Sequence, residues 1–222
     1  MKKRILVMGD IHGCRISLET MLDALQPTND DLIVTLGDYV DRGPDSRGVI
    51  ERLLELKKTH DYIHLMGNHE IQMIRALEAP HHMERFLSGL CGGKDTLDNY
   101  GGSFKGIPED HWEFITSAKL YHETDDHILV HAGIEADRPV DDQDTETYYY
   151  QRFYEAQPHI SGKTVVCGHT IQGDLPTNLG HSICLDTCAY GNGWLTCLDT
   201  LTGTYWQTNE QGQQRQDNIA NL

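Results

Sequence analysis

Three stretches decide the fold of this chain: Gly9-Asp-Ile-His-Gly13, Gly37-Asp-Tyr-Val-Asp-Arg-Gly43 and Gly67-Asn-His-Glu70. Each follows directly on a short apolar run, at residues 5–8, 32–36 and 62–66 respectively. Continuous apolar runs of this length are typical of strands that are buried on both faces of a parallel sheet. Because the carboxyl ends of parallel strands meet at one edge of a sheet, we expect the polar side chains of the three stretches to lie close together.

Helical periodicity separates these strands. The first intervening segment carries apolar residues at i, i+3, i+4 and i+7, namely Leu18, Met21, Leu22 and Leu25, and it ends before Pro27. The second repeats the pattern with Val49, Ile50, Leu53, Leu54 and Leu56. Strands that alternate with amphipathic helices predict βαβ units with right-handed crossovers, and so an α/β fold.

The chain beyond residue 70 is organised differently. Helical patterns at 71–79 and 108–118 surround a glycine-rich segment, 91–102, so residues 70–120 are expected to form a helical excursion from the sheet. Strand patterns return, and we expect them to be mostly antiparallel, at 127–130, 164–167, 182–185, 195–198 and 204–207. No linker divides the chain, which predicts one domain over 1–208. Residues 209–222 are polar and aperiodic, and they are expected to form a surface tail.

Composition excludes several classes of protein. The 222 residues include 34 acidic and 18 basic side chains, and the net charge of -16 disfavours a nucleic-acid polymer as partner. No apolar run approaches the roughly 20 residues of a membrane span. The basic start Met1–Arg4 precedes only four apolar residues, too few for a signal peptide, so a cytoplasmic location is expected. The six cysteines include no C-x-x-C pair, which disfavours a zinc knuckle or a disulfide scaffold.

Six side chains after the predicted strands can bind metal. Four of them belong to the three opening stretches, and two histidines follow the later strand patterns 127–130 and 164–167; the set is Asp10, His12, Asp38, Asn68, His131 and His169. Oxygen and imidazole ligands suit Mn, Fe or Zn. Six ligands are enough for two cations if one carboxylate bridges them, and such a pair can hold a phosphoryl group.

The three opening stretches resemble the sequence blocks of the calcineurin-like metallophosphoesterases, specifically the PPP family of serine/threonine protein phosphatases. Later segments, among them GGKDTLDNYG at 92–101 and LDTCAYGNGWLT at 185–196, are similar to blocks of its bacterial and phage members. The resemblance implies a β-sandwich of mixed sheets flanked by α-helices, in α-β-β-α layers. It also implies a dinuclear metal site at the carboxyl ends of the strands.

The resemblance implies a role for each matching residue. One metal is held by Asp10, His12 and Asp38, and the second by Asp38, Asn68, His131 and His169. His69 is the general acid with Asp41 hydrogen-bonded behind it, and the phosphoryl oxygens are bound by Arg42, Arg152 and Asn68. Arg152 lies in Tyr150-Gln-Arg-Phe153, where its neighbours depart from the usual tryptophan-rich pattern of the family.

The protein is expected to be a phosphoprotein phosphatase that uses two divalent cations. Mn is the expected metal, and Fe and Zn are the alternatives. It would hydrolyse phosphoserine or phosphothreonine in a protein or peptide by direct attack of a metal-bridging hydroxide. Symmetrical diadenosine tetraphosphatases resemble the same blocks, so hydrolysis of a nucleotide or of another small phosphate ester is the alternative. A non-catalytic metal-binding regulatory module is a third hypothesis, although the chain retains every expected ligand.

Four further features of the sequence bear on function. The acidic stretch 135–146 is expected to be a solvated loop, and the tyrosines at 148–150 are expected to belong to the core. Cys14 directly follows the first stretch and could be sensitive to oxidation. Cys188 stands where relatives mostly have glycine, which is typical of a small residue tolerated in a turn.

Overall fold

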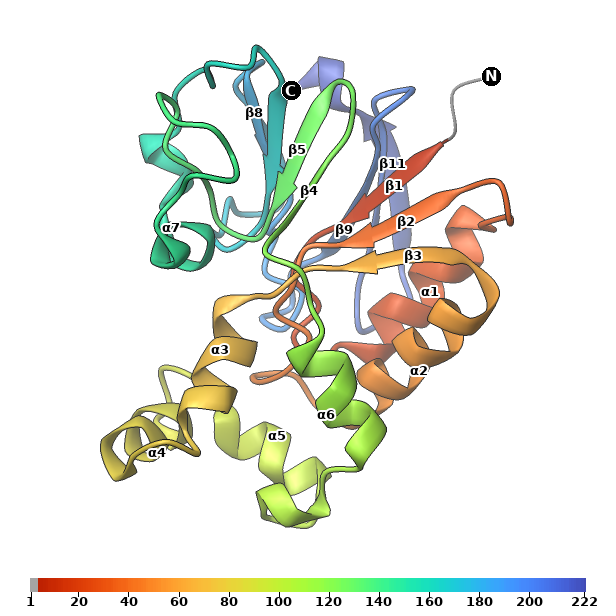
Figure 1. The fold of residues 1–222 in the computed structure, drawn as a ribbon. Coiled ribbons are helices and arrows are strands. Elements are labelled where there is room, and N and C mark those ends of the chain that lie inside the picture. Colours follow the sequence, from red (N-terminus) through yellow and green to blue (C-terminus); the bar gives the residue numbers. More distant parts are fainter. Residues whose placement is uncertain (1–3) are drawn as a thin grey trace.

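Two β-sheets lie face to face in the computed structural model, which describes residues 4–222 (Figure 1). Most of the basic start of the chain, Met1–Lys3, lies outside the described residues. The first sheet has the strand order β11-β10-β9-β1-β2-β3, and the second has the order β4-β5-β6-β8-β7. Helices lie on the outer faces, which confirms the α/β architecture of two mixed sheets flanked by helices.

The first sheet contains the three strands that were predicted from the opening stretches. β1 (Ile5–Met8), β2 (Leu32–Thr35) and β3 (Asp61–His64) are parallel to one another. The sheet is completed on the other side of β1 by antiparallel strands, β9 (Leu195–Asp199), β10 (Thr204–Thr208) and β11 (Gln214–Asn218). The two ends of the chain therefore share one sheet.

The second sheet is built from the middle of the chain. Its strands are β4 (Tyr121–Glu123), β5 (His127–Val130), β6 (Thr164–Cys167), β7 (Thr177–Asn178) and β8 (Ser182–Cys184). β6 pairs in parallel with both β5 and β8. Of the pairings that the described strands β4 to β11 make, five are antiparallel and two are parallel, which confirms the expectation of a mostly antiparallel second half. The two parallel pairings arise because the loops after β5 and β6 carry the chain back across the sheet instead of turning as hairpins.

The helices fall into three groups. α1 (Arg15–Leu25) and α2 (Ser46–Thr59) connect the parallel strands of the first sheet, and α7 (Thr145–Tyr150) lies beside the second sheet. The excursion predicted over 70–120 contains α3 (Asn68–Arg75), α4 (Pro80–Leu87), α5 (Gly93–Asn99) and α6 (Glu109–Thr116). α5 lies inside the glycine-rich segment, where the sequence had indicated no helix. None of the helices within 4–222 is long and apolar enough to cross a lipid bilayer.

Three apolar clusters account for the layers. Strand β1 shows the arrangement, because Leu6 and Met8 pack toward the cluster under α1 and α2, whereas Val7 packs between the sheets with Leu129 and Val166. The third cluster lies between the second sheet and α7 and includes Tyr148 and Tyr149, which confirms the core prediction for these two tyrosines. Alternate side chains of one strand thus serve two different layers.

The polar C-terminal segment is not the tail that was expected. Residues 214–218 form β11, which pairs along its whole length with β10, and residues 219–221 form a 3-10 helix. The side chains of β11 are largely exposed, in keeping with the expected surface location, but the segment is a strand of the first sheet and not a tail. An edge strand is stabilised by its backbone hydrogen bonds to one neighbour, and it needs no apolar periodicity to form.

Candidate metal centre and active site

The six predicted ligands come from two sheets and meet at one place. Asp10 and His12 follow β1, Asp38 follows β2, and Asn68 begins α3 after β3. The second sheet contributes His131 after β5 and His169 after β6. The side chains of this set are nearly all buried. One triad drawn wholly from it, Asp10, Asp38 and His131, lies close enough to share a cation, as do His12 and Asp38 together with His69. The site is therefore formed where the carboxyl ends of strands from both sheets converge.

The loops that carry these residues have unusual backbone conformations. His12, Asp38 and His169 all have positive φ, at 45°, 51° and 63° respectively. Such conformations in residues other than glycine are uncommon and concentrate at functional sites. The neighbouring glycines allow the close approach, since a Cβ on Gly43 would lie 1.8 Å from the carbonyl oxygen of His12, and one on Gly168 would lie 1.9 Å from Asp10 Oδ1.

Asp38 lies at the centre of the cluster. Its Oδ2 is 3.4 Å from His12 Nε2, and its Oδ1 is 3.5 Å from His131 Nε2. The same carboxylate faces His69 Nε2 at 3.8 Å, and its Oδ1 accepts a hydrogen bond from the His69 backbone N–H. A carboxylate that presents its two oxygens to ligands on opposite sides has the position required of a bridging ligand.

The tautomers of the histidines show that a cation suits this arrangement. His131 Nδ1 lies 3.0 Å from the carbonyl oxygen of Leu36, so Nδ1 donates and Nε2 carries a lone pair. That bare nitrogen is 2.9 Å from Asn68 Oδ1, itself an acceptor. His12 is fixed in the same way, since its Nδ1 donates to the carbonyl oxygen of Val40 at 2.9 Å. Imidazoles oriented by backbone carbonyls are typical of metal ligands, and a cation would occupy the space between the facing lone pairs.

Burial keeps these imidazoles neutral. It lowers the pKa of His12 and His131 below the ordinary value, and it lowers the pKa of His169 to about 3. His169 Nδ1 lies 2.8 Å from the same Asn68 oxygen, while its Nε2 is buried without a hydrogen-bond partner. Neutral imidazole is the form that binds metal, so no proton has to be removed at neutral pH before coordination.

Two buried carboxyl groups, Asp10 in the cluster and Asp186 beside it, are suited to a neighbouring cation. Burial raises the pKa of Asp10 well above its ordinary value, and the neighbouring Asp186 and Asp38 add to the effect. Burial likewise raises the pKa of Asp186 to about 6. Closely spaced buried carboxylates are unfavourable without a cation between them. The donor set of carboxylate, amide and imidazole groups therefore fits a divalent dinuclear centre.

Glu70 shapes the loop that presents Asp38. Its buried carboxylate accepts hydrogen bonds from the backbone N–H groups of Asp38 at 2.9 Å, Tyr39 at 2.8 Å and Gly67 at 3.0 Å. Burial raises the pKa of Glu70 to about 8, and the neighbouring Asp38 contributes in the same direction. Glu70 was quoted in the third stretch, but no role was predicted for it. Its structural role is to join the turn after β2 to the start of α3.

His69 and Asp41 form a buried pair beside the cluster. His69 Nδ1 is 2.7 Å from Asp41 Oδ2, so the carboxylate fixes the ring and leaves Nε2 directed toward Asp38. Burial lowers the pKa of His69, but the Asp38 and Asp41 carboxylates more than offset this, so the pKa lies above its ordinary value. The Asp41 contribution persists when cations neutralise Asp38. The geometry can hold a proton on His69 Nε2.

The helical excursion holds Asp41 in place. Thr96 Oγ1 donates to Asp41 Oδ1 at 2.6 Å and accepts from the Asp41 backbone N–H at 2.8 Å. Ser46 Oγ accepts from the same N–H at 3.1 Å, and Cys91 Sγ donates weakly to Asp41 Oδ2 at 3.4 Å. All of these groups are buried. Asp41 is consequently constrained at both its backbone and its carboxylate.

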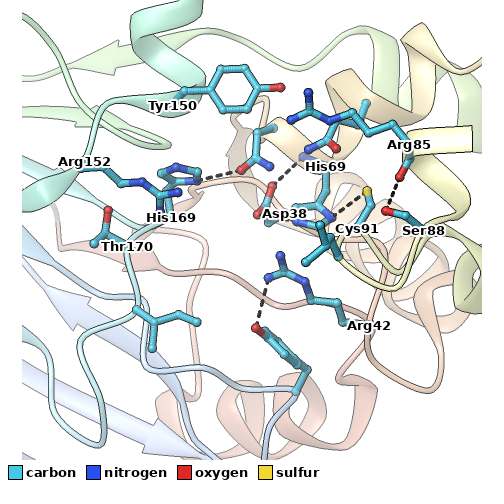
Figure 2. A pocket seen from close by; sticks show the side chains of 15 residues that line it. Asp38, Arg42, His69, Arg85, Ser88, Cys91, Tyr150, Arg152, His169 and Thr170 are labelled. Carbon is cyan, nitrogen blue, oxygen red and sulfur yellow. Dashed lines mark hydrogen bonds and ion pairs between the residues drawn. The ribbon is translucent and has the colours of Figure 1, made fainter. Parts of the chain in front are cut away.

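An open pocket of about 550 Å³ lies over the cluster. Arg42, Arg85 and Arg152 line it, and among the described residues Asp38 is the one acidic side chain in its lining. Figure 2 shows these arginines on different sides of the pocket, with Asp38 and His69 between them. Arg42 Nη1 donates to His12 Nε2 and to the hydroxyl oxygen of Tyr190, both at 3.2 Å. The pocket presents cations to an anion although the whole chain is strongly acidic.

The structure brings every predicted site residue to this pocket or to the cluster beneath it. Arg152 lines the pocket beside His169, although its sequence context had departed from the family pattern. Sequence reasoning assigned no role to Thr96, Arg85, Asp186 or Tyr190. Asp186 had a sequence signal in Leu185-Asp-Thr187 and Thr96 had one in the glycine-rich block, whereas nothing in the sequence distinguished Arg85 from other exposed arginines.

Other predictions have mixed outcomes. The acidic stretch 135–146 is largely exposed, and Arg138 lies within hydrogen-bond distance of both Glu135 and Asp142, as expected of a solvated loop. Cys14 is fully buried, and burial raises the pKa of its thiol, so the structure does not favour oxidation there. Cys188 has φ of 58°, a conformation that glycine adopts without strain.

Two facing mixed sheets flanked by helices, with a buried cluster of histidine and aspartate at their strand ends, define a metal-dependent phosphoesterase. The chain belongs to the calcineurin-like phosphoesterase family, whose match covers residues 3–173.

Known proteins similar to this chain act on different substrates. It is 29% identical over 220 residues to the asymmetrical bis(5'-nucleosyl)-tetraphosphatase PrpE of Oceanobacillus iheyensis, covering 85% of this chain and 86% of that protein. It is 32% identical over 127 residues to a symmetrical bis(5'-nucleosyl)-tetraphosphatase of Ralstonia nicotianae, covering 57% of this chain and 41% of that one. Serine/threonine-protein phosphatase 2 of Salmonella typhimurium is 39% identical over 77 residues, or 34% of each chain.

A solved structure confirms the fold. The crystal structure of a protein assigned as a diadenosine tetraphosphatase superposes with a TM-score of 0.69 at 22% identity, covering 97% of this chain and 93% of that one. At this level of identity the likeness concerns the fold alone. The relatives divide between nucleotide and protein substrates, and the tetraphosphatase likeness covers more of the chain than the protein phosphatase likeness.

Proposed function

We propose that this protein hydrolyses dinucleoside tetraphosphates in a reaction that depends on divalent metal. The observation that carries the proposal is the set of three arginines around one pocket, with a single carboxylate between them. One phosphoryl group would be bound by two guanidinium groups and the metals, so a third guanidinium favours a substrate with more than one phosphoryl group. This changes the order of the hypotheses drawn from sequence, in which phosphoprotein hydrolysis came first.

The rim of the pocket supports a nucleoside at each end of such a substrate. Tyr150 and Tyr190 line it with aromatic rings, and Leu90 and Ile171 line it with apolar side chains that are 89% and 48% exposed. Any of the nucleobases can stack on an aromatic ring. Exposed apolar side chains beside a cationic pocket are stabilised when a ligand covers them. The volume of about 550 Å³ lies within the range of sites for small organic ligands.

We assign the metal ligands as the sequence resemblance implies. Asp10, His12 and Asp38 would hold one cation, and Asp38, Asn68, His131 and His169 would hold the other. Two such cations would neutralise phosphoryl oxygens and lower the pKa of a water molecule. Mn is the proposed metal, because the oxygen and imidazole donors suit it and no thiolate lies in the ligand set.

The protein's own groups would then orient the substrate and move a proton. Arg42 and Arg152 would bind the oxygens of the phosphoryl group under attack, where their planar donors match the anion. His69 Nε2 would donate its proton to the departing oxygen, and Asp41 would hold the ring in the required tautomer. In a tetraphosphate the departing oxygen belongs to another phosphate, so this proton contributes less than it would for a serine or threonine ester.

Phosphoserine or phosphothreonine hydrolysis is the second candidate. The block pattern in 9–13, 37–43 and 67–70 favours it, and the same arginines and histidine would serve a monoester. A non-catalytic regulatory module is the third hypothesis, and the complete set of inward-facing donors argues against it.

One experiment separates these candidates. The ratio of kcat/KM for diadenosine tetraphosphate to that for a phosphoserine peptide is measured with purified protein and Mn, with Asp38→Asn as the control. We expect a ratio well above one that is lost in the control, and chromatography of the products shows whether cleavage is symmetrical (two ADP) or asymmetrical (ATP and AMP). A ratio well below one would assign the protein to the phosphatases that act on phosphoproteins. Activity on neither substrate, with both metals bound, would favour the binding module.

A further inference from the structure

We infer that Arg85, on α4 of the helical excursion, forms a subsite for a phosphoryl group beyond the one at the metal centre and selects polyphosphates over monoesters. The inference rests on the proposed function and deepens it. Arg42 and Arg152 lie against the cluster, since Arg42 donates to His12 and Arg152 lies beside His169. Arg85 enters the pocket from a different element and contacts none of the proposed metal ligands by any hydrogen bond within residues 4–222.

The position of Arg85 is fixed by its neighbour. Phe86 is fully buried under α5, where a Cβ on Gly93 would lie 2.5 Å from its ring, and Phe86 also packs against Phe104 at 5.6 Å between ring centroids. Because Phe86 fixes the rotation of α4, the adjacent Arg85 projects toward the pocket, as Figure 2 shows. The backbone of α4 therefore needs no rearrangement for Arg85 to reach a ligand, and the conformational cost is confined to ordering one side chain.

A second, smaller hollow continues the pocket along α4. It has a volume of about 60 Å³, and Gln72, Arg85 and Tyr150 line both this hollow and the main pocket. Arg75 and His82 complete its lining, but the Arg75 guanidinium is already bound by Glu146. The pocket and the smaller hollow together extend from the metal centre across α3 to Arg85. A chain of linked phosphoryl groups would follow this direction.

Arg85 is available for an anion. Within residues 4–222 it has no ion-pair partner, whereas Arg75, Arg47 and Arg138 on the same molecule each have an acidic partner. Arg42 and Arg152 also lack an ion-pair partner within residues 4–222, so in a chain of net charge -16 this pocket collects arginines without acidic partners. The guanidinium fork binds phosphoryl oxygens in a bidentate manner, and an adjacent Gln72 amide can add a donor.

The test compares Arg85→Gln with the wild type and with Arg47→Gln, which removes the same charge from the exposed face of α2 outside both hollows. We expect kcat/KM for diadenosine tetraphosphate to fall by about tenfold in Arg85→Gln, the lower end for a charged hydrogen bond because the side chain is exposed. Turnover of p-nitrophenyl phosphate, which has one phosphoryl group, should change less than twofold. Arg47→Gln should change neither the kcat/KM for diadenosine tetraphosphate nor the turnover of p-nitrophenyl phosphate. Equal losses on both substrates, or no loss on either, would overturn the inference.

A binding measurement separates this inference from the proposed function. Inorganic tripolyphosphate and orthophosphate are compared as inhibitors of p-nitrophenyl phosphate turnover, with free Mn held constant. Wild type should be inhibited more strongly by tripolyphosphate, and Arg85→Gln should lose that preference while its inhibition by orthophosphate is unchanged. If diadenosine tetraphosphate is not a substrate but the preference depends on Arg85, the dinucleotide function fails and the subsite stands. If the preference survives in Arg85→Gln, the subsite is wrong whatever the substrate.

Discussion

At the scale of single residues, one hydroxyl group connects the helical excursion to the proposed proton donor. Thr96 Oγ1 contacts both the carboxylate and the backbone N–H of Asp41, and Asp41 in turn orients His69. Asp41 has φ of 71°, so its backbone would relax without partners that hold it. Thr96 touches no reacting atom, and it acts as a positioning residue through Asp41.

Thr96→Val removes this hydroxyl with little change in volume. We expect turnover of an alkyl phosphate to fall by about tenfold, because a buried carboxylate that loses a hydrogen bond holds His69 less firmly. Turnover of p-nitrophenyl phosphate should fall less, since its leaving group needs little protonation. The measurement is kcat for both esters at saturating Mn.

Two controls separate positioning from misfolding. Thr96→Ser keeps the hydroxyl and should restore the alkyl phosphate activity, and His69→Asn defines the loss when the proton donor is absent. If Thr96→Val lowers kcat equally for both esters, or if the serine variant is as impaired as the valine variant, Thr96 supports the fold and not the proton donor.

At the scale of elements, the contact between β3 and α6 depends on a buried neutral histidine. His64 stacks on Phe114 with ring centroids 4.3 Å apart, and its Nε2 is 2.8 Å from the carbonyl oxygen of Phe114. Burial lowers the pKa of His64 to about 4, although the hydrogen bond opposes the shift. The ring must therefore stay neutral for α6 to pack on the sheet.

Acid should weaken this contact in a defined pH range. Because the folded pKa lies below the unfolded value of about 6.5, the unfolded chain binds the proton first, and the stabilisation is complete above about pH 6.5. This stabilisation is lost as the pH falls toward 4. The free energy of unfolding should fall by about 2 kcal/mol between pH 7 and pH 5 through His64 alone. We expect urea unfolding to show this loss in the wild type, and a smaller loss in His64→Phe.

Comparing the two proteins at each pH isolates the contribution of His64. Both are measured at the same free metal concentration, because the metal ligands also titrate. His81→Gln changes a largely exposed histidine and should keep the wild-type pH dependence. The same pH dependence in His64→Phe and in the wild type would contradict the assignment.

At the scale of the whole molecule, the metal centre lies across the junction of the two sheets. Asp10, His12 and Asp38 follow strands of the first sheet, whereas His131 and His169 follow strands of the second. The facing acceptors found around Asn68 and Asp38 repel one another until a cation lies between them. Bound metal should consequently join the sheets as well as support catalysis.

Removal of metal should therefore lower the stability of the entire fold. A ligand present at about 100 times its Kd stabilises a folded protein by roughly 2.7 kcal/mol, and the effect grows with its concentration. We expect the thermal midpoint to rise with added Mn after treatment with a chelator, and to rise less in His131→Gln, which removes a ligand of the second sheet. A midpoint independent of Mn in the wild type would mean that no metal links the sheets.

Much of this protein follows from its sequence. The apolar runs before residues 9, 37 and 67 determine three parallel strands, because strands buried on both faces need continuous apolar side chains. The polar residues after those runs must then meet, because neighbouring parallel strands end at the same edge. Asp10, His12, Asp38 and Asn68 were predicted in this way, whereas His69 was implied by the family resemblance, and the structure brings all five together.

Tertiary structure alone decided the remainder. The parallel pairing of β6 with its neighbours and the pairing of β11 with β10 depend on long-range backbone hydrogen bonds, which leave no periodic mark in the side chains. Arg85 and Thr96 reach the site from the helical excursion, 47 and 58 residues after Asp38 in the chain. Their roles depend on the packing of α4 and α5 over the strand ends, because residues distant in sequence become neighbours only when the elements that carry them are packed together.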